Sequence, residues 1–272
     1  MRIDWHQVYA AIWRSKSQKL KPVVRLDPVR LDELQGIDRQ KQAIIANTQH
    51  FLEGKTSNHA LLWGARGTGK SSVIKALLNE MAPKGLRIIQ IDKDDLGFLP
   101  EILDDLEQES EQFRFIIFCD DLSFEAGESS YKPLKTLLEG GLELPPEHVR
   151  LYATSNRRHL LPEKQSKNQL SGVVDGEVHY ADSLEDKLAL SDRFGLTLSF
   201  YPANWENYFA IVETLFADIN TDKSQLHEAA RLYAMGRGSH SGRTAKQFYQ
   251  YYRAQFYQNH INAWLIVVCN FG

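Results

Sequence analysis

Residues 64–71 are Gly64-Ala65-Arg66-Gly67-Thr68-Gly69-Lys70-Ser71, which match the phosphate-binding pattern G-x-x-x-x-G-K-[ST]. The apolar run 59–63 before them is typical of a buried strand, and residues 72–78 after them are typical of a helix. Glycines let the backbone curl closely around an anion, and the helix N-terminus adds partial positive charge at the same point. The stretch therefore predicts a nucleotide site made by residues 64–71 together with Ser72.

Two side chains of this loop have distinct expected tasks. Lys70 is expected to reach the β- and γ-phosphates of ATP, and the Ser71 hydroxyl is expected to ligate Mg²⁺. The alternative is a chance match, which arises in on the order of one chain in a hundred of this length. The flanking strand and helix patterns disfavour that alternative.

The composition limits the class of protein. A chain of 272 residues with 43% hydrophobic residues can build one large domain or two smaller ones. The net charge of -3 gives no global positive field for nucleic acid or anionic membranes, although a local basic face stays open. No apolar run approaches the roughly 18 residues of a membrane span, and the N-terminus has no apolar core of a secretion signal. With only two cysteines, Cys119 and Cys269, we expect no disulfide framework and no zinc cluster, and a cytoplasmic location.

The first 35 residues are predicted to form a helix and an extended segment. Pro22 and Pro28 mark the extended part. The predicted helix either packs on the body of the protein or docks a partner or a membrane surface. Its apolar residues at helical spacing are Trp5, Val8, Tyr9, Ile12 and Trp13.

A buried strand over residues 115–119 ends in Asp120 and Asp121. Parallel α/β sheets place ligands at the carboxyl ends of their strands. Next to a phosphate loop, Asp120 is expected to hold Mg²⁺ through water, and Asp121 to orient or deprotonate the attacking water. The alternative is a strand that ends in a solvated turn.

Another strand, over residues 149–155, ends at Asn156. The amide of Asn156 is expected to fix a water beside the γ-phosphate, or else it simply caps the exit of the strand. Strands and helices alternate from residue 36 to residue 202, which predicts a P-loop domain with a doubly wound parallel sheet. Residues 161–181 are polar and irregular, as in an insertion or a mobile loop.

Past residue 202 the pattern is helical. Residues 203–260 predict a small C-terminal helical lid, and residues 261–272 an apolar tail that is either buried or prone to aggregate. An aromatic stripe in the third helix is more typical of a bundle core than of a base-stacking platform. The stripe consists of Phe248, Tyr252 and Phe256. The same C-terminal segment is locally basic because it contains Arg231, Arg237, Arg243, Lys246 and Arg253.

The order of these features resembles that of AAA+ ATPases over about residues 36–257. The features are the phosphate loop, the Asp120-Asp121 strand end, Asn156, the run Asp192-Arg193-Phe194 and the pair Gly242-Arg243. More narrowly, residues 64–72, 118–124 and 190–196 resemble the AAA+ group called domain of unknown function eight-fifteen.

This resemblance implies roles for further residues. Gly36 and Ile37 would lie near the adenine, Asn156 would be the first sensor, and Arg243 would be the second sensor, reaching the phosphates from the lid. Arg193 is similar to the arginine finger that completes a neighbouring subunit's site, a group typically worth about 10³–10⁵ in rate. The alternatives are an ion pair of Arg193 with Asp192 or another acid, and a solvated Arg243.

One departure from the family pattern affects the expected rate. Many AAA+ proteins have Asp-Glu where this chain has Asp120-Asp121, and the shorter carboxylate favours slow hydrolysis. Glu125 is an alternative base.

Three functions follow. The first is a homo-oligomer that hydrolyses ATP with Mg²⁺ to remodel or load a protein or nucleic-acid partner. The second is a slow nucleotide switch that recruits a partner. The third is a nucleic-acid loader that uses the basic lid.

Overall fold

The structure is a computed structural model that describes residues 3–107, 109, 111–124, 131–140, 146–158, 160, 190–219 and 221–253. The chain divides into two compact units. The sheet unit comprises Met1–Leu31, Asp38–Ala65 and Lys70–Phe200, and the helical unit comprises Asp32–Ile37, Arg66–Gly69 and Tyr201–Gly272. The predicted boundaries at residues 35, 202 and 260 stay a prediction.

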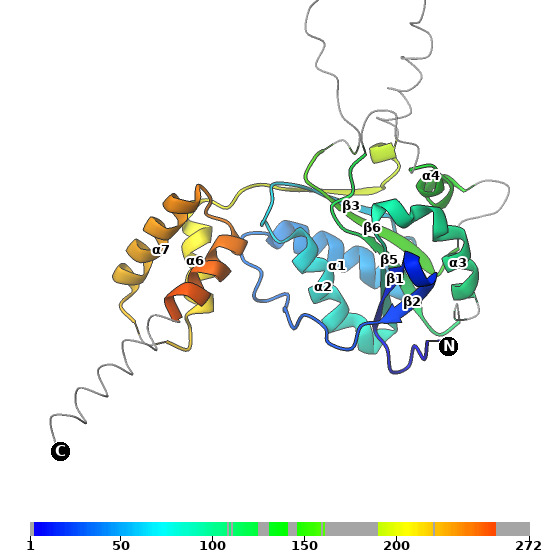
Figure 1. The fold of residues 1–272 in the computed structure, drawn as a ribbon, viewed down its shortest axis with the longest axis horizontal. Coiled ribbons are helices and arrows are strands. Elements are labelled where there is room, and N and C mark those ends of the chain that lie inside the picture. The colour runs from blue at the N-terminus through cyan, green and yellow to red at the C-terminus, as the bar shows by residue number, and fades with distance from the viewer. Residues whose placement is uncertain are drawn as a thin grey trace, which may run out of the picture. The chain divides into compact units, whose positions relative to one another are not determined.

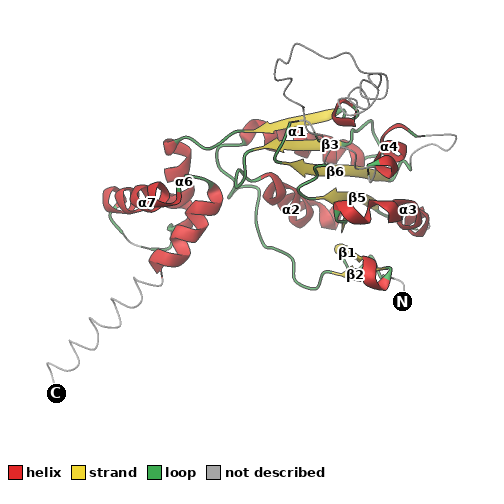
Figure 2. Cartoon of the chain, turned by 45° about the horizontal axis from the view of Figure 1, so that its top comes forward, coloured by secondary structure: helices red, strands yellow, loops and turns green. Residues whose placement is uncertain are grey.

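The sheet unit is built on a seven-stranded sheet, in the order β2-β1-β4-β5-β6-β3-β7. Figure 2 shows β5, β6 and β3 side by side in this order. The β1–β2 pair is antiparallel and every other neighbouring pair is parallel, so the predicted α/β fold with a doubly wound sheet is confirmed. The strands are β1 (Ala10–Arg14), β2 (Lys19–Pro22), β3 (Ala60–Gly64), β4 (Leu86–Gln90), β5 (Arg114–Cys119), β6 (Val149–Ser155) and β7 (Leu196–Phe200).

Helices connect these strands on both faces of the sheet (Figure 1). The step from β3 to β4 runs one way along the sheet, and the steps to β5 and β6 run the other way. Right-handed crossovers therefore place α2 on one face and α3 and α4 on the other. The helices are α1 (Asp38–Leu52), α2 (Lys70–Met81), α3 (Leu99–Glu107) and α4 (Lys132–Glu139), with short 3-10 turns η1 (Ser15–Ser17), η2 (Ala82–Lys84) and η3 (Lys93–Phe98).

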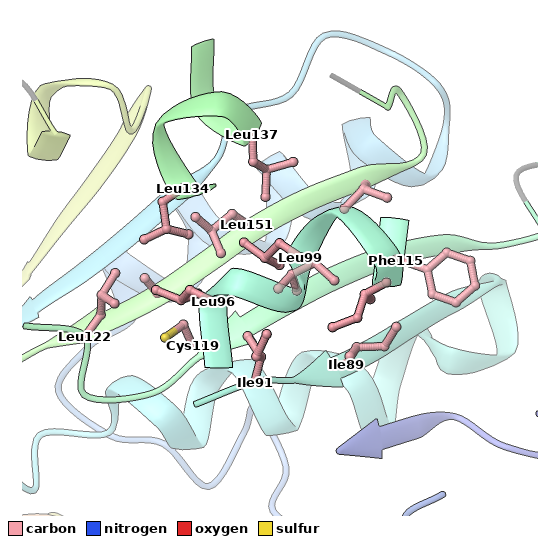
Figure 3. Close-up of a cluster of buried hydrophobic side chains, with 14 of the residues drawn as sticks. Ile89, Ile91, Leu96, Leu99, Phe115, Cys119, Leu122, Leu134, Leu137 and Leu151 are labelled. Atoms are coloured by element: carbon pink, nitrogen blue, oxygen red, sulfur yellow. The ribbon is translucent and has the colours of Figure 1, made fainter. Parts of the chain in front are cut away.

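One large apolar core lies between the sheet and the helices α3 and α4 (Figure 3). Alternate strand residues point into it, as the period of two along a strand requires. Leucines of η3, α3 and α4 cover them. The core includes Ile89, Phe115, Leu151, Leu96, Leu99, Leu134 and Leu137. This packing fixes the carboxyl ends of β5 and β6, where the predicted acidic and amide side chains follow.

The predicted N-terminal helix is wrong, because residues 10–14 form strand β1. β1 pairs in parallel with β4, with Ala10 opposite Ile88. A short apolar run fits both periods, and pairing to an open sheet edge decides between them. The buried Arg87 side chain anchors the preceding turn, since its Nε donates to the Trp5 carbonyl at 2.7 Å.

The helical unit contains α6 (Trp205–Leu215), α7 (Lys223–Arg237) and a helix over residues 242–253. Asn204 and Asp222 cap α6 and α7, because each side chain accepts a backbone N–H of the first turn. Phe248 is buried and Tyr252 packs against the same core, which confirms the predicted core role for these two residues of the stripe.

Several predictions lie outside the described residues. They concern the insertion over residues 161–181, Glu125, Phe256, Cys269 and the tail over residues 261–272. Within the described ranges, none of the helices has the length and apolarity that crossing a bilayer would take.

Candidate functional site

Three neighbouring strands carry the predicted site residues at their carboxyl ends. The sheet order places β6 between β5 and β3. Cys119 lies opposite Ala153, so Asp120 follows beside Thr154. Trp63 lies opposite Ser155, so Gly64 follows beside Asn156. Gly64, the two aspartates and Asn156 therefore meet where these central strands end.

Lys70 opens helix α2 and is buried, with 7% of its surface exposed. Its ammonium group donates to the carbonyls of Gly64 at 2.8 Å and Ala65 at 2.7 Å. It also donates to the Oδ1 of Asn156 at 3.3 Å. The Lys70 ammonium group is thus held at the end of β3 and is hydrogen-bonded to Asn156 at the end of β6.

The next residue, Ser71, faces the first aspartate. Its hydroxyl donates to Oδ1 of Asp120 at 2.6 Å, and the Thr154 hydroxyl donates to the same oxygen at 2.5 Å. A serine hydroxyl and a carboxylate oxygen side by side are oxygen ligands of the kind that Mg²⁺ prefers.

The second aspartate has an unusual backbone. Asp121 adopts φ 56°, in the left-handed region that few residues other than glycine enter. Its N–H donates to the Thr154 hydroxyl at 2.9 Å, and the side-chain amide of Asn156 donates to its Oδ1. A continuous hydrogen-bonded network therefore runs through Lys70, Asn156, Asp121, Thr154, Asp120 and Ser71.

The first glycine of the loop is required by sterics. Gly64 has φ 134°, and a Cβ added there would overlap the backbone carbonyl of Phe200 on the neighbouring strand β7. The same carbonyl accepts the N–H of Ala65 at 3.1 Å. The loop can thus leave the sheet closely beside β7 only because residue 64 lacks a side chain.

These residues fit a magnesium nucleotide. Among the described residues, no group of three or more His, Cys, Asp or Glu side chains could enclose a metal ion. Mg²⁺ in nucleotide sites is held by one or two protein oxygens and by the phosphates themselves, so such a cage is not needed. Ser71 and Asp120 supply that small donor set.

Cys119 ends strand β5 directly before the aspartates. Burial, with a smaller effect of Asp120 and Asp92, raises the pKa of its thiol to about 12. The thiol is fully buried, and such an environment is typical of a structural cysteine rather than of a reactive one.

The helical unit contains the middle of the loop, Arg66–Gly69, and the predicted second sensor. A cavity of about 210 Å³ there has three guanidinium groups and several hydroxyls in its wall, a lining that suits an anion. Gly67 lies closely against Ser241, because an added Cβ would be 2.7 Å from its Oγ. The lining residues are Arg66, Gly67, Arg237, Ser239, Ser241, Arg243, Thr244 and Gln247.

The two residues predicted to lie near the adenine also belong to the helical unit. Ile37 is buried, and its Cδ1 would be 3.4 Å from a Cβ added to Gly69. Gly36 has φ 74° and packs against the side chain of Asn207. Ile37 thus lies beside Gly69 in the loop segment Arg66–Gly69, in which Thr68 is half-buried.

Arg193 does not enter the network around Lys70. Its Nε donates to Oε1 of Glu139, the last residue of helix α4, and 16% of its side chain is exposed. Within one chain the guanidinium is thus paired with a neighbouring acid, one of the two alternatives that the sequence leaves open.

The sequence matches the family described as "Protein of unknown function (DUF815)" over residues 6–256. The chain belongs to the DUF815 family. This confirms the narrower resemblance of the three motifs. No curated protein matches the sequence.

Solved structures similar to this DUF815 chain include the RuvB Holliday junction branch migration motor of Thermotoga maritima. It is 14% identical, with a TM-score of 0.48, and the likeness covers 82% of this chain and 72% of that chain. Two single-residue variants of the same protein have TM-scores of 0.47 at 14% and 13% identity, with the same coverage. At this identity and TM-score the likeness assigns no activity to the DUF815 chain.

Three contacts of the DUF815 site were not predicted from the sequence. Thr154 joins both aspartates, Arg237 lines the cavity of the helical unit, and Glu139 pairs with Arg193. The signal for Thr154 is its place two residues before Asn156 on a strand that adjoins β5. Finding it requires the sheet order and register.

Proposed function

We propose that this DUF815 protein is an AAA+-type ATPase that binds ATP with Mg²⁺ and hydrolyses it at the subunit interfaces of a homo-oligomer. The cycle would remodel or load a protein or nucleic-acid partner. The observation that supports this most is the hydrogen-bonded network that links Lys70 to Ser71 through both aspartates and Asn156. It joins a cation, a pair of oxygens suited to bind a metal, and a candidate base at the carboxyl ends of strands β3, β5 and β6.

The residues of the sheet unit have separate tasks in this proposal. When bound, Mg·ATP supplies the phosphoryl group to be transferred and a metal charge that offsets the charge developing on the phosphate oxygens. Lys70 provides the protein's own positive charge, and Ser71 and Asp120 hold the metal. Asp121 orients the attacking water and takes its proton, while Asn156 keeps that carboxylate in place.

The helical unit has a set of cations of its own. Arg243 shares one cavity wall with Arg66 and Arg237, so an anion in this cavity would meet three guanidinium groups. We propose that this cavity accepts phosphate oxygens, with Gly36 and Ile37 beside the base. The oligomer is inferred because an arginine finger, Arg193, acts only on a neighbouring subunit's nucleotide.

A slow nucleotide switch is the second candidate. It is favoured by Asp121, since one of its oxygens already accepts the Asn156 amide and its side chain is one methylene shorter than glutamate. One acceptor position of the carboxylate is therefore already occupied, and the shorter side chain must sit closer to the water, which would slow the chemical step. In that case the bound nucleotide would mainly control the recruitment of a partner.

Turnover measured over a range of protein concentrations separates the two. The assembled enzyme predicts specific activity that rises steeply with concentration, whereas the switch predicts flat activity near zero. An Asp121→Asn variant should bind ATP as well as the wild type under both hypotheses, and it should lose the turnover that the assembled enzyme shows. If this variant hydrolyses ATP at the wild-type rate, Asp121 is not the base. The same variant, held in ATP, is the bait for capturing the partner.

A further inference from the structure

Thr154 forms hydrogen bonds with the residues that directly follow strand β5. It is 2% exposed and bonds to three consecutive residues of the neighbouring chain segment. Its hydroxyl donates to Oδ1 of Asp120 at 2.5 Å and accepts the N–H of Asp121 at 2.9 Å. Its carbonyl accepts the N–H of Leu122 at 2.7 Å.

A hydroxyl is well suited to this position. Its single O–H donates a hydrogen bond to the Asp120 carboxylate, and its oxygen lone pairs accept a hydrogen bond from the Asp121 N–H. The two bonds polarise each other, because a hydroxyl that donates to a negative oxygen is a better acceptor. A methyl group of the same size could make neither bond.

The two bonds act on different properties of the site. The bond to Asp120 fixes the same carboxylate oxygen that accepts the Ser71 hydroxyl, so it sets the pair expected to hold the metal. The bond to the Asp121 N–H supports a left-handed backbone at φ 56°, which directs the second carboxylate toward Asn156. One side chain thus sets the orientation of both aspartates.

We propose that Thr154 is a positioning residue for magnesium binding and for the chemical step, acting through Asp120 and Asp121. This inference rests on the proposed ATPase function, because it assigns Thr154 a task in that site. It adds a residue that the phosphate-loop and strand-end motifs do not contain.

The test compares Thr154→Val, which keeps the shape and removes the hydroxyl, with Thr154→Ser, which keeps the hydroxyl. Thr197→Val is the matched control, since Thr197 lies on strand β7 and its hydroxyl donates only a weak bond to the Phe194 carbonyl at 3.3 Å. Binding of a fluorescent ATP analogue is measured first in EDTA and then in a titration with Mg²⁺. Turnover is measured at saturating nucleotide and metal.

For Thr154→Val we expect unchanged binding in EDTA, because Lys70 and the loop are intact. The Mg²⁺ concentration at half-saturation should rise about tenfold and kcat should fall about 10- to 100-fold, the usual effect of losing a hydrogen bond to a charged group. Thr154→Ser should restore both, and Thr197→Val should match the wild type.

Three results would overturn the inference. The first is a Thr154→Val variant with the metal requirement and kcat of Thr197→Val. The second is a Thr154→Ser variant as impaired as Thr154→Val, which would show that only the packing matters. The third is a loss of EDTA binding with a lowered unfolding temperature, which would show a purely structural role. A wild-type protein that binds no Mg·ATP refutes the proposed function itself, whereas the other results leave that function standing.

Discussion

Replacing Arg193 with alanine separates a structural ion pair from a catalytic arginine. In one chain Arg193 pairs with Glu139, and 16% and 39% of the two side chains are exposed. A pair with this much exposure contributes about 1 kcal/mol or less to the free energy of unfolding. Such a loss lowers the unfolding temperature of a domain of this size by about 2–4 °C. An arginine finger lost from the hydrolytic site instead lowers turnover by about 10³–10⁵.

The assay combines thermal unfolding with ATP turnover on three variants. Arg193→Ala should unfold within a few degrees of the wild type, bind ATP normally and lose turnover. Glu139→Gln breaks the same ion pair but keeps the guanidinium, so it should show a similar unfolding temperature and retain turnover. Lys70→Ala should lose nucleotide binding while keeping an intact Arg193.

Mixing two inactive variants tests whether the arginine acts between subunits. A mixed oligomer of Arg193→Ala and Lys70→Ala contains interfaces with one intact nucleotide site and one intact finger. We therefore expect partial recovery of activity on mixing. Wild-type turnover in Arg193→Ala at every protein concentration would refute the finger, and inactivity of the mixture would refute its action in trans.

Three further predictions follow from single contacts. In denaturant titrations, Gly64→Ala should lower the free energy of unfolding by about 3 kcal/mol or more, because its Cβ would meet the Phe200 carbonyl. The control is Gly97→Ala, which should fold normally because its Cβ would meet nothing within 4 Å. Burial, with a smaller effect of Arg150, lowers the pKa of His59 to about 4, so the unfolded state binds more protons between about pH 4 and 6.5. The free energy of unfolding should therefore rise with pH across this window, by at most about 3 kcal/mol, and His59→Asn should flatten that rise. In calorimetric titrations, Arg243→Ala should weaken the binding of ATP more than the binding of adenosine. Equal weakening of both would show that Arg243 does not contact the phosphates.

The phosphate loop and the strands around it were predictable because their signals are local. The glycine spacing, the apolar run before Gly64 and the helical run after Lys70 need no knowledge of the fold. The aspartates at the end of β5 and Asn156 at the end of β6 were predictable for the same reason.

The contacts that complete the site were not predictable, because each depends on residues far apart in sequence. Thr154 reaches Asp120 only through the register of β5 and β6, and Glu139 reaches Arg193 across 54 positions. The sequence favours a helix where β1 forms, because residues 10–14 carry no sign of the open edge of β4 that pairs with them. Tertiary pairing overrides a weak local preference there.

Calorimetric titration of Mg·ATP into the wild type, Lys70→Ala and Lys75→Ala shows directly whether Lys70 and its loop bind the nucleotide. Lys75 lies on the same helix, is exposed and pairs with Asp27, so it controls for the loss of a lysine. We predict that the wild type and Lys75→Ala bind with equal affinity, and that Lys70→Ala binds at least about 100-fold more weakly. No binding by the wild type, or equal binding by all three proteins, would contradict this prediction.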